Sequence, residues 1–180
     1  MELSQLVVII GPNGGDLLIN IKEGVKLMVL NNIKAFFLYL GLDVMVLFLF
    51  SPISGKFFSS STVVPRLFGL FSVVLCICLG LLLTPQGAKY KNFLSCLLPA
   101  IIGFLVGIYC YVNWPDGNSN YQSGWQLAYS YYTCNSIWMV GFLNNTGRPF
   151  YNANLAPIYS FIPSFLLFIG LELKARVIKR

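Results

Sequence analysis

The sequence predicts an all-α integral membrane protein with four transmembrane helices. Three observations lead to this prediction: the composition, four long apolar segments, and an uneven distribution of Lys and Arg. Hydrophobic residues make up 57% of the 180 residues, charged residues make up only 10%, and the mean hydropathy is +0.73. Soluble domains carry about 25% charged residues. A chain so poor in charge is typical of a protein that crosses a membrane several times.

Four segments meet the length requirement of a transmembrane helix, which is about 20 mostly apolar residues. They are Ile33–Phe50, Val64–Leu83, Phe93–Val112 and Leu155–Leu173. Pro157 lies in the first turn of the fourth segment, where proline is tolerated, and Pro163 predicts a kink further along it. We therefore expect three transmembrane helices within residues 33–112, and a fourth helix with a basic tail within residues 155–180.

Lys and Arg set the expected orientation, because cytoplasmic loops of membrane proteins carry an excess of both. If the two termini are cytoplasmic, nine of the 12 basic residues lie inside: Lys22, Lys26, Lys34, Lys89, Lys91, Lys174, Arg176, Lys179 and Arg180. Lys56, Arg66 and Arg148 then lie outside. The sequence thus predicts that both termini, including the whole segment 1–32, face the cytoplasm.

The stretch VVIIGPNGGDLL, residues 7–18, begins like a nucleotide-binding strand and phosphate loop. A phosphate loop of the form G-x-x-x-x-G-K-[ST] needs a lysine and a hydroxyl after its second glycine. Counted from Gly11, the positions of the second glycine, the lysine and the hydroxyl hold Asp16, Leu17 and Leu18. An aspartate repels phosphate, so the stretch is not expected to bind a nucleotide.

Two other structures are expected in the same N-terminal segment. Leu6–Ile10 and Leu17–Ile21 are short β-prone runs joined by a Gly/Pro/Asn turn, which predicts a small β-hairpin. Ile21–Asn32 has apolar residues on one face, with Lys22 and Lys26 on the adjoining flank. This pattern is typical of an amphipathic helix that lies on a membrane surface. The alternative is that this stretch is the start of the first transmembrane helix.

Residues 113–154 are expected to form an external segment rich in aromatic residues. Tryptophan prefers the headgroup zone of a bilayer, and the segment contains Trp114, Trp125 and Trp138. Gln126–Leu143 is long enough to be a fifth span, but a fifth span would move the basic C-terminal tail outside. We therefore expect an amphipathic helix or a re-entrant segment at the outer face.

Asp43 is the most informative residue of the first span. A carboxylate near the bilayer centre costs about 2.5–3.5 kcal/mol on insertion scales, so its side chain should face protein or water. Ser72 and Ser164 lie at about the same depth in their own spans, and the three residues predict an intramembrane polar layer. Three roles remain open for Asp43: a protonated group that joins helices, part of an ion or proton pathway, or one member of an acidic ring in a pore.

Two residue pairs are candidates for holding the helices together. Gly103 and Gly107 form a GxxxG motif in the third span, and small residues four apart let helix backbones approach closely. This motif fits packing within one chain as well as packing between copies. Cys110 and Cys134 both face the external side in this topology, where thiols oxidise. A Cys110–Cys134 disulfide is expected, with two free thiols as the alternative.

The residue inventory argues against an enzyme. The chain has no histidine, which is the commonest general base and metal ligand. It also lacks a G-x-S-x-G elbow, paired carboxylates and the cysteine spacings of zinc sites. We therefore predict no catalysis, no cofactor and no metal. The basic residues on the cytoplasmic side are Lys174, Arg176, Lys179 and Arg180. We expect them to bind membrane lipid, together with a soluble cytoplasmic protein. No direct nucleic-acid binding is expected.

In its overall plan the chain resembles the four-span inner-membrane subunits (KwaA) of the bacterial Kiwa anti-phage defence system. The resemblance rests on the span layout, the external stretch SGWQLAYSYYTCNSIWMVG (Ser123–Gly141) and the short cytoplasmic ends, and it transfers no individual functional residue. It implies a bacterial inner-membrane location. It also implies a homo-oligomeric sensor of phage-induced envelope disturbance, which recruits a soluble DNA-binding effector at its cytoplasmic face.

Two further functions remain open on the residues alone. One is a small oligomeric ion channel or pore centred on Asp43, and the other is a structural subunit of a larger membrane complex.

Overall fold

The computed structural model describes residues 14–50, 63–112, 132 and 156–178, and all regular structure within them is helical. The helices are α1 (Gly14–Phe50), α3 (Val63–Gly80), α4 (Lys89–Leu94), α5 (Leu98–Val112), α7 (Ala156–Tyr159) and α8 (Phe161–Ile178). The described part of the chain contains no strand, which confirms the all-α prediction.

Length and composition identify one candidate transmembrane helix among the described residues. It is the 24-residue stretch Glu23–Val46 within α1. Two shorter apolar stretches, Arg66–Gly80 in α3 and Leu98–Tyr109 in α5, fall below the length that crosses a bilayer unaided. The described part of the chain is therefore all-helical, with one helix long and apolar enough to cross a membrane. The four-span arrangement is part of the proposed function.

Helix α1 corrects the predicted β-hairpin. It runs unbroken for 37 residues, about 55 Å at 1.5 Å per residue, and it includes Leu17–Ile21, so the second strand of the hairpin is wrong. The first strand, Leu6–Ile10, lies outside the described residues. A short apolar run does not distinguish strand from helix, and no proline interrupts the chain between Gly14 and Phe50. Ile21–Asn32 is continuous with the rest of α1, as expected if it begins the first span.

The third predicted span, Phe93–Val112, is not one helix. Helix α4 ends at Leu94 and α5 begins at Leu98. Pro99 explains the interruption, because it has no N–H to donate to the carbonyl of Ser95 four residues earlier. The prediction treated Pro99 as part of a continuous helix and missed this break.

The fourth predicted span is also divided. Helices α7 and α8 are separated at Ser160, and Pro163 removes the N–H that would bond to the carbonyl of Tyr159. The interruption therefore lies next to the proline for which a kink was expected. Helix α8 continues to Ile178, five residues beyond the predicted end at Leu173.

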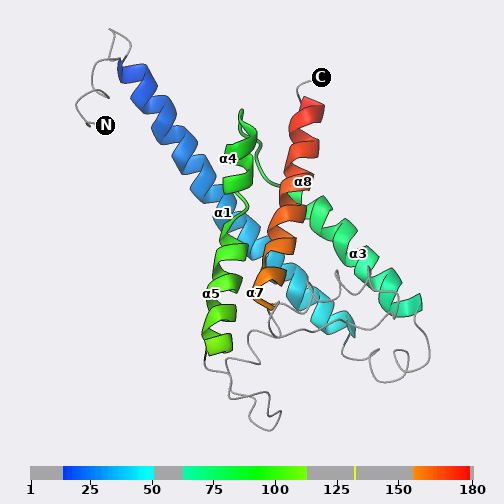
Figure 1. The fold of residues 1–180 in the computed structure, drawn as a ribbon. Helices are drawn as coiled ribbons and strands as arrows, with labels where there is room; N and C mark the ends of the chain where they lie inside the picture. The colour runs from blue at the N-terminus through cyan, green and yellow to red at the C-terminus, as the bar shows by residue number, and fades with distance from the viewer. Residues whose placement is uncertain (1–13, 51–62, 113–131, 133–155, 179–180) are drawn as a thin grey trace.

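The helices form a bundle in which α8 packs most extensively on α3 and also contacts α5 (Figure 1). The start of α1, helix α4 and the end of α8 lie at one end of the bundle (Figure 1). The end of α1, the start of α3 and the end of α5 lie at the opposite end. The core consists of small and branched side chains: Ala35, Leu42, Val46, Cys76, Leu83, Cys96, Leu167 and Leu171.

Two glycines bring α3 and α8 into direct backbone contact. A Cβ atom on Gly170 would overlap the carbonyl oxygen of Ile77 and lie 2.9 Å from the Cα of Gly80. A Cβ atom on Gly80 would overlap the carbonyl oxygen of Leu167. Only glycine permits helix backbones to come this close. This pair was not predicted, since the two residues are 90 positions apart in the sequence.

Candidate functional site

Seven polar side chains near helix α4 hydrogen-bond to other helices or loops, and together with Thr84, which takes part through its backbone, we call them the polar belt. Its members come from α1, the α3–α4 loop, α4, the α4–α5 turn and α8. They are Asn31, Asn32, Thr84, Gln86, Asn92, Ser95, Glu172 and Lys174. Four of them, Asn31, Gln86, Asn92 and Ser95, are buried. Buried polar groups of this kind are stable only when hydrogen-bonded.

Asn31 fixes the α3–α4 loop to α1. Its Nδ2 donates to the carbonyl oxygen of Thr84 at 2.7 Å, and its Oδ1 accepts from the backbone N–H of Thr84 at 3.2 Å. One fully buried amide therefore satisfies both backbone groups of a loop residue 53 positions away.

Replacing Asn31 with leucine is expected to lower the free energy of unfolding by about 1–3 kcal/mol, because both backbone groups of Thr84 lose their partner. Thermal unfolding of the full chain in mild detergent measures the loss. Lys34→Leu, on the exposed side of α1, is the control and should leave the unfolding temperature nearly unchanged. Equal shifts for the two variants would contradict this role of Asn31.

Asn32 joins the two pieces of the interrupted third span. Its Nδ2 donates to the carbonyl oxygens of Leu94, at 2.8 Å, and Met28, at 3.1 Å. Its Oδ1 accepts from the N–H of Leu98 at 2.9 Å. Helix ends leave backbone groups unsatisfied, and here one side chain of α1 serves the last residue of α4 and the first residue of α5.

The rest of the polar belt ties α8 to the α3–α4 loop. Asn92 accepts from the N–H of Gln86 at 2.7 Å and donates to Glu172 Oε1 at 2.7 Å. Gln86 Nε2 also donates to Ser95 Oγ at 2.7 Å. The ammonium group of Lys174 donates to the carbonyl oxygen of Leu83 at 2.9 Å. The basic end of α8 is thus held by the loop that follows α3.

Tyr132 is the one described residue of the predicted external segment, and it packs into the bundle. Its ring meets the ring of Tyr39 edge to face, with centroids 5.2 Å apart. Tyr39 OH donates to the carbonyl oxygen of Tyr132 at 2.6 Å, and Tyr132 OH donates to the carbonyl oxygen of Pro99 at 2.5 Å. Pro99 lies 13 residues from the far end of α5, a rise of about 20 Å. Tyr132 therefore contacts the first turn of α5, at the opposite end of the helix from Val112.

Gly103 gives Tyr132 the room that it needs. A Cβ atom at Gly103 would lie 2.5 Å from Tyr132 Cε1 and 2.6 Å from Ser160 Oγ. Gly103 thus packs within this chain against two other segments. Gly107 is buried on the same helix.

The three predicted intramembrane polar residues are all buried. Asp43 is 2% exposed, Ser72 is 0% and Ser164 is 4%. Ser164 Oγ accepts from the N–H of Ala100 at 3.1 Å, and neither serine hydrogen-bonds to Asp43. Because its side chain is almost fully buried, Asp43 faces the bundle and not its surroundings.

Several predicted residues lie outside the described part of the chain. Among them are the three tryptophans, one partner of the expected disulfide, and the last two basic residues: Trp114, Trp125, Trp138, Cys134, Lys179 and Arg180. Cys110 belongs to α5, but its side chain is also outside the described residues. The remaining basic residues differ from each other, since Lys174 is part of the polar belt and Arg176 is exposed.

The polar belt was not predicted as a unit. The one local signal was the Asn31-Asn32 pair, which interrupts an otherwise apolar stretch and was treated as the boundary of the first span. No group of three potential metal ligands occurs among the described residues. Comparisons with known protein families, curated proteins and solved structures give no match for this chain.

Proposed function

We propose that this chain is a non-enzymatic, four-span protein of a bacterial inner membrane, and that it acts as an oligomeric sensor or anchor that recruits a soluble cytoplasmic protein. Anti-phage defence is the setting that the resemblance to Kiwa membrane subunits suggests. One observation carries the proposal: Tyr132, from the external segment, and Asn32, from the polar belt, both bind the first turn of α5.

This arrangement would link the predicted external segment to the polar belt at one point, the first turn of α5. A displacement of Tyr132 would act on Pro99, and the preceding residue, Leu98, is held by Asn32. The polar belt then continues to Glu172 and Lys174 in α8. Allosteric coupling requires an element with two arrangements, and the α4–α5 break is the element proposed for this role.

The position of the polar belt supports four spans with both termini on one side. Asn31 and Asn32 directly precede Ile33, where the first predicted span begins. Lys174 directly follows Leu173, where the fourth predicted span ends. Polar side chains therefore gather where the apolar spans begin and end, as expected at a membrane boundary.

The burial of Asp43 favours the sensor or anchor over a pore. An acidic ring that selects ions must face the axis of the channel, but Asp43 is 2% exposed within a single chain. A buried carboxylate fits the first of the three roles considered from the sequence, a protonated group between helices of one bundle.

The basic residues that follow Lys174, of which Arg176 is exposed in the structure, are the expected contact for the soluble partner. We expect a triple variant, Arg176→Gln with Lys179→Gln and Arg180→Gln, to bind the partner about tenfold more weakly, a loss of about 1.4 kcal/mol. The measurement is the native mass of the protein purified in mild detergent after expression with its genomic neighbours.

Lys26→Gln on the exposed face of α1 is the control and should keep the partner. A lone monomer without a second chain would refute the proposal. A homo-oligomer without a soluble chain would favour the pore, and a complex with other membrane chains would favour the structural subunit.

A further inference from the structure

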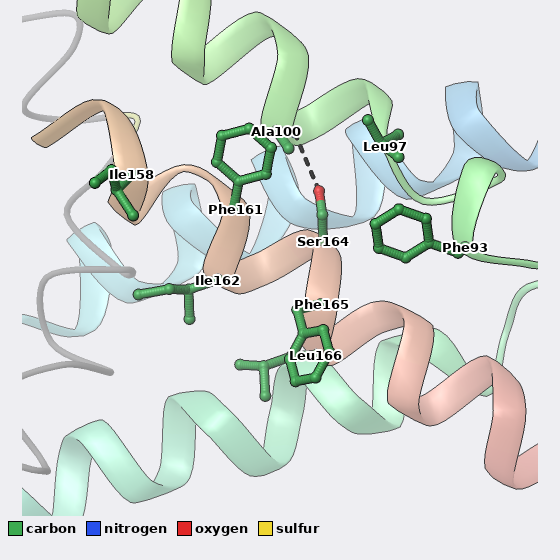
Figure 2. Close-up of a pocket in the computed structure, with 9 residues that line it drawn as sticks. All are labelled: Phe93, Leu97, Ala100, Ile158, Phe161, Ile162, Ser164, Phe165 and Leu166. Carbon is green, nitrogen blue, oxygen red and sulfur yellow. Dashed lines mark hydrogen bonds between the residues drawn. The ribbon is translucent and has the colours of Figure 1, made fainter. Parts of the chain in front are cut away.

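An apolar groove of about 350 Å³ lies between the two helix interruptions (Figure 2). Phe93, Leu97 and Ala100 line one side, and residues of α7 and α8 from Ile158 to Leu166 line the other. Leu97, in the turn between α4 and α5, lines the groove, and so do Ile158 and Phe161, which flank the break between α7 and α8. The groove therefore lies beside both helix interruptions.

The described walls of the groove offer hydrocarbon and no free polar group. Among the lining residues, the hydroxyl of Ser164 is the one side-chain polar atom, and that hydroxyl already accepts from the N–H of Ala100 (Figure 2). The groove is open to the surroundings, since Ile158 is 57% exposed and Phe165 is 55% exposed. Its ligand must therefore be a flexible apolar chain that enters from the side.

A basic residue lies one helix turn from Phe93, at the α4 end of the groove. Lys89 precedes Phe93 by four residues, so the two side chains share a face of α4. Lys89 is exposed, and Tyr90 beside it is 64% exposed. Amphipathic aromatic and basic side chains together are typical of the headgroup zone. In the proposed orientation this end faces the cytoplasm, where basic pockets between helices bind anionic headgroups.

We propose that the groove binds one acyl chain of an anionic phospholipid, with the phosphate of its headgroup against Lys89. The apolar walls fit the chain, and Lys89, one turn from Phe93 on the same face of α4, fits the charge of the headgroup. This inference rests on the membrane location in the proposed function. That location is tested first by washing membranes with carbonate, and release of the wild-type chain would overturn both.

The binding test is native mass spectrometry of the full-length protein in mild detergent. Phosphatidylglycerol and phosphatidylcholine with identical acyl chains are titrated in parallel. We expect phosphatidylglycerol to bind more tightly by about fivefold, the factor expected for one basic residue near an anionic headgroup. Lys89→Gln should remove this preference, whereas Lys26→Gln, an exposed basic residue of α1, should retain it.

Variants that fill the groove test the contribution of the acyl chain to binding separately from that of the headgroup. Leu97→Trp should reduce binding of both lipids, and Phe37→Trp, on a 63% exposed residue of α1, should not. If Leu97→Trp does not fold, Ile158→Trp at the open side of the groove replaces it. A carbonate-resistant protein that binds both lipids equally would overturn the inference and leave the proposed function standing. Equal lipid binding by Leu97→Trp and Phe37→Trp would also overturn the inference and leave the proposed function standing.

Discussion

Replacing Gly170 with valine is expected to separate α3 from α8 and to lower the free energy of unfolding by about 3 kcal/mol or more. Overpacking a well-packed contact costs about 1–3 kcal/mol when side chains can adjust. Here the new atoms meet the Ile77 carbonyl and the Gly80 Cα, and backbone cannot move aside like a flexible side chain. The same argument applies to Gly80→Val. Thermal unfolding in mild detergent, with the fraction of monodisperse protein, measures the effect.

Gly41 provides the matched control for this prediction. It lies in the interior of α1 and is exposed, and a Cβ atom added there would meet no other atom within 4 Å. Gly41→Val therefore adds the same atoms to a helix without a collision, and it should leave the unfolding temperature unchanged or raise it slightly. Equal losses for Gly41→Val and Gly170→Val would show that the α3–α8 contact is not the critical one.

Truncation of Tyr132 to alanine is expected to be the second severe change, with a loss of about 3–5 kcal/mol. This is the usual cost of removing a packed aromatic ring, and here the ring contacts Tyr39 and lies beside Gly103. Tyr132→Phe keeps the ring and removes only the hydrogen bond to Pro99, so it should cost about 1 kcal/mol. Thermal unfolding of the full chain compares the two variants.

Tyr132→Phe also tests whether Tyr132 is coupled to the binding of the soluble partner. If Tyr132 transmits a change to α5, this variant should alter binding of the soluble partner more than its small effect on stability explains. Tyr90→Ala, on a 64% exposed tyrosine, serves as the stability control. If Tyr132→Ala unfolds no more easily than Tyr90→Ala, the contacts of Tyr132 with the bundle are not important for stability.

The helical class followed from the composition, because a chain with 57% hydrophobic residues and 10% charged residues satisfies its backbone in lipid mainly through helices. The break near Pro163 could also be predicted from the sequence, since proline lacks the N–H that a continuous helix requires. The same reasoning applied to Pro99 would have divided the third span. The predicted strand Leu17–Ile21 was wrong because the β preference of five residues does not outweigh their position within a long continuous helix.

The contacts that position the candidate site could not be predicted from the sequence, for a different reason. Asn31 meets Thr84 across 53 residues, and Asn92 meets Glu172 across 80. Which polar residues face each other depends on how the helices cross, and the crossing depends on the Gly80–Gly170 contact. The GxxxG motif drew attention to Gly103 because its spacing is visible within one helix. A pair made of one glycine from each of two helices leaves no such pattern.

The first turn of α5 has a consequence for what this protein can carry. In many transporters, a discontinuous helix exposes the N–H groups of its broken end, and these groups hold the cargo. Here the N–H of Leu98 binds Asn32, Pro99 has none, and the N–H of Ala100 binds Ser164. The N–H of Ile101 binds the carbonyl oxygen of Leu97. Every N–H from Leu98 to Ile101 is occupied by the chain itself, so the start of α5 offers no free backbone donor to a solute.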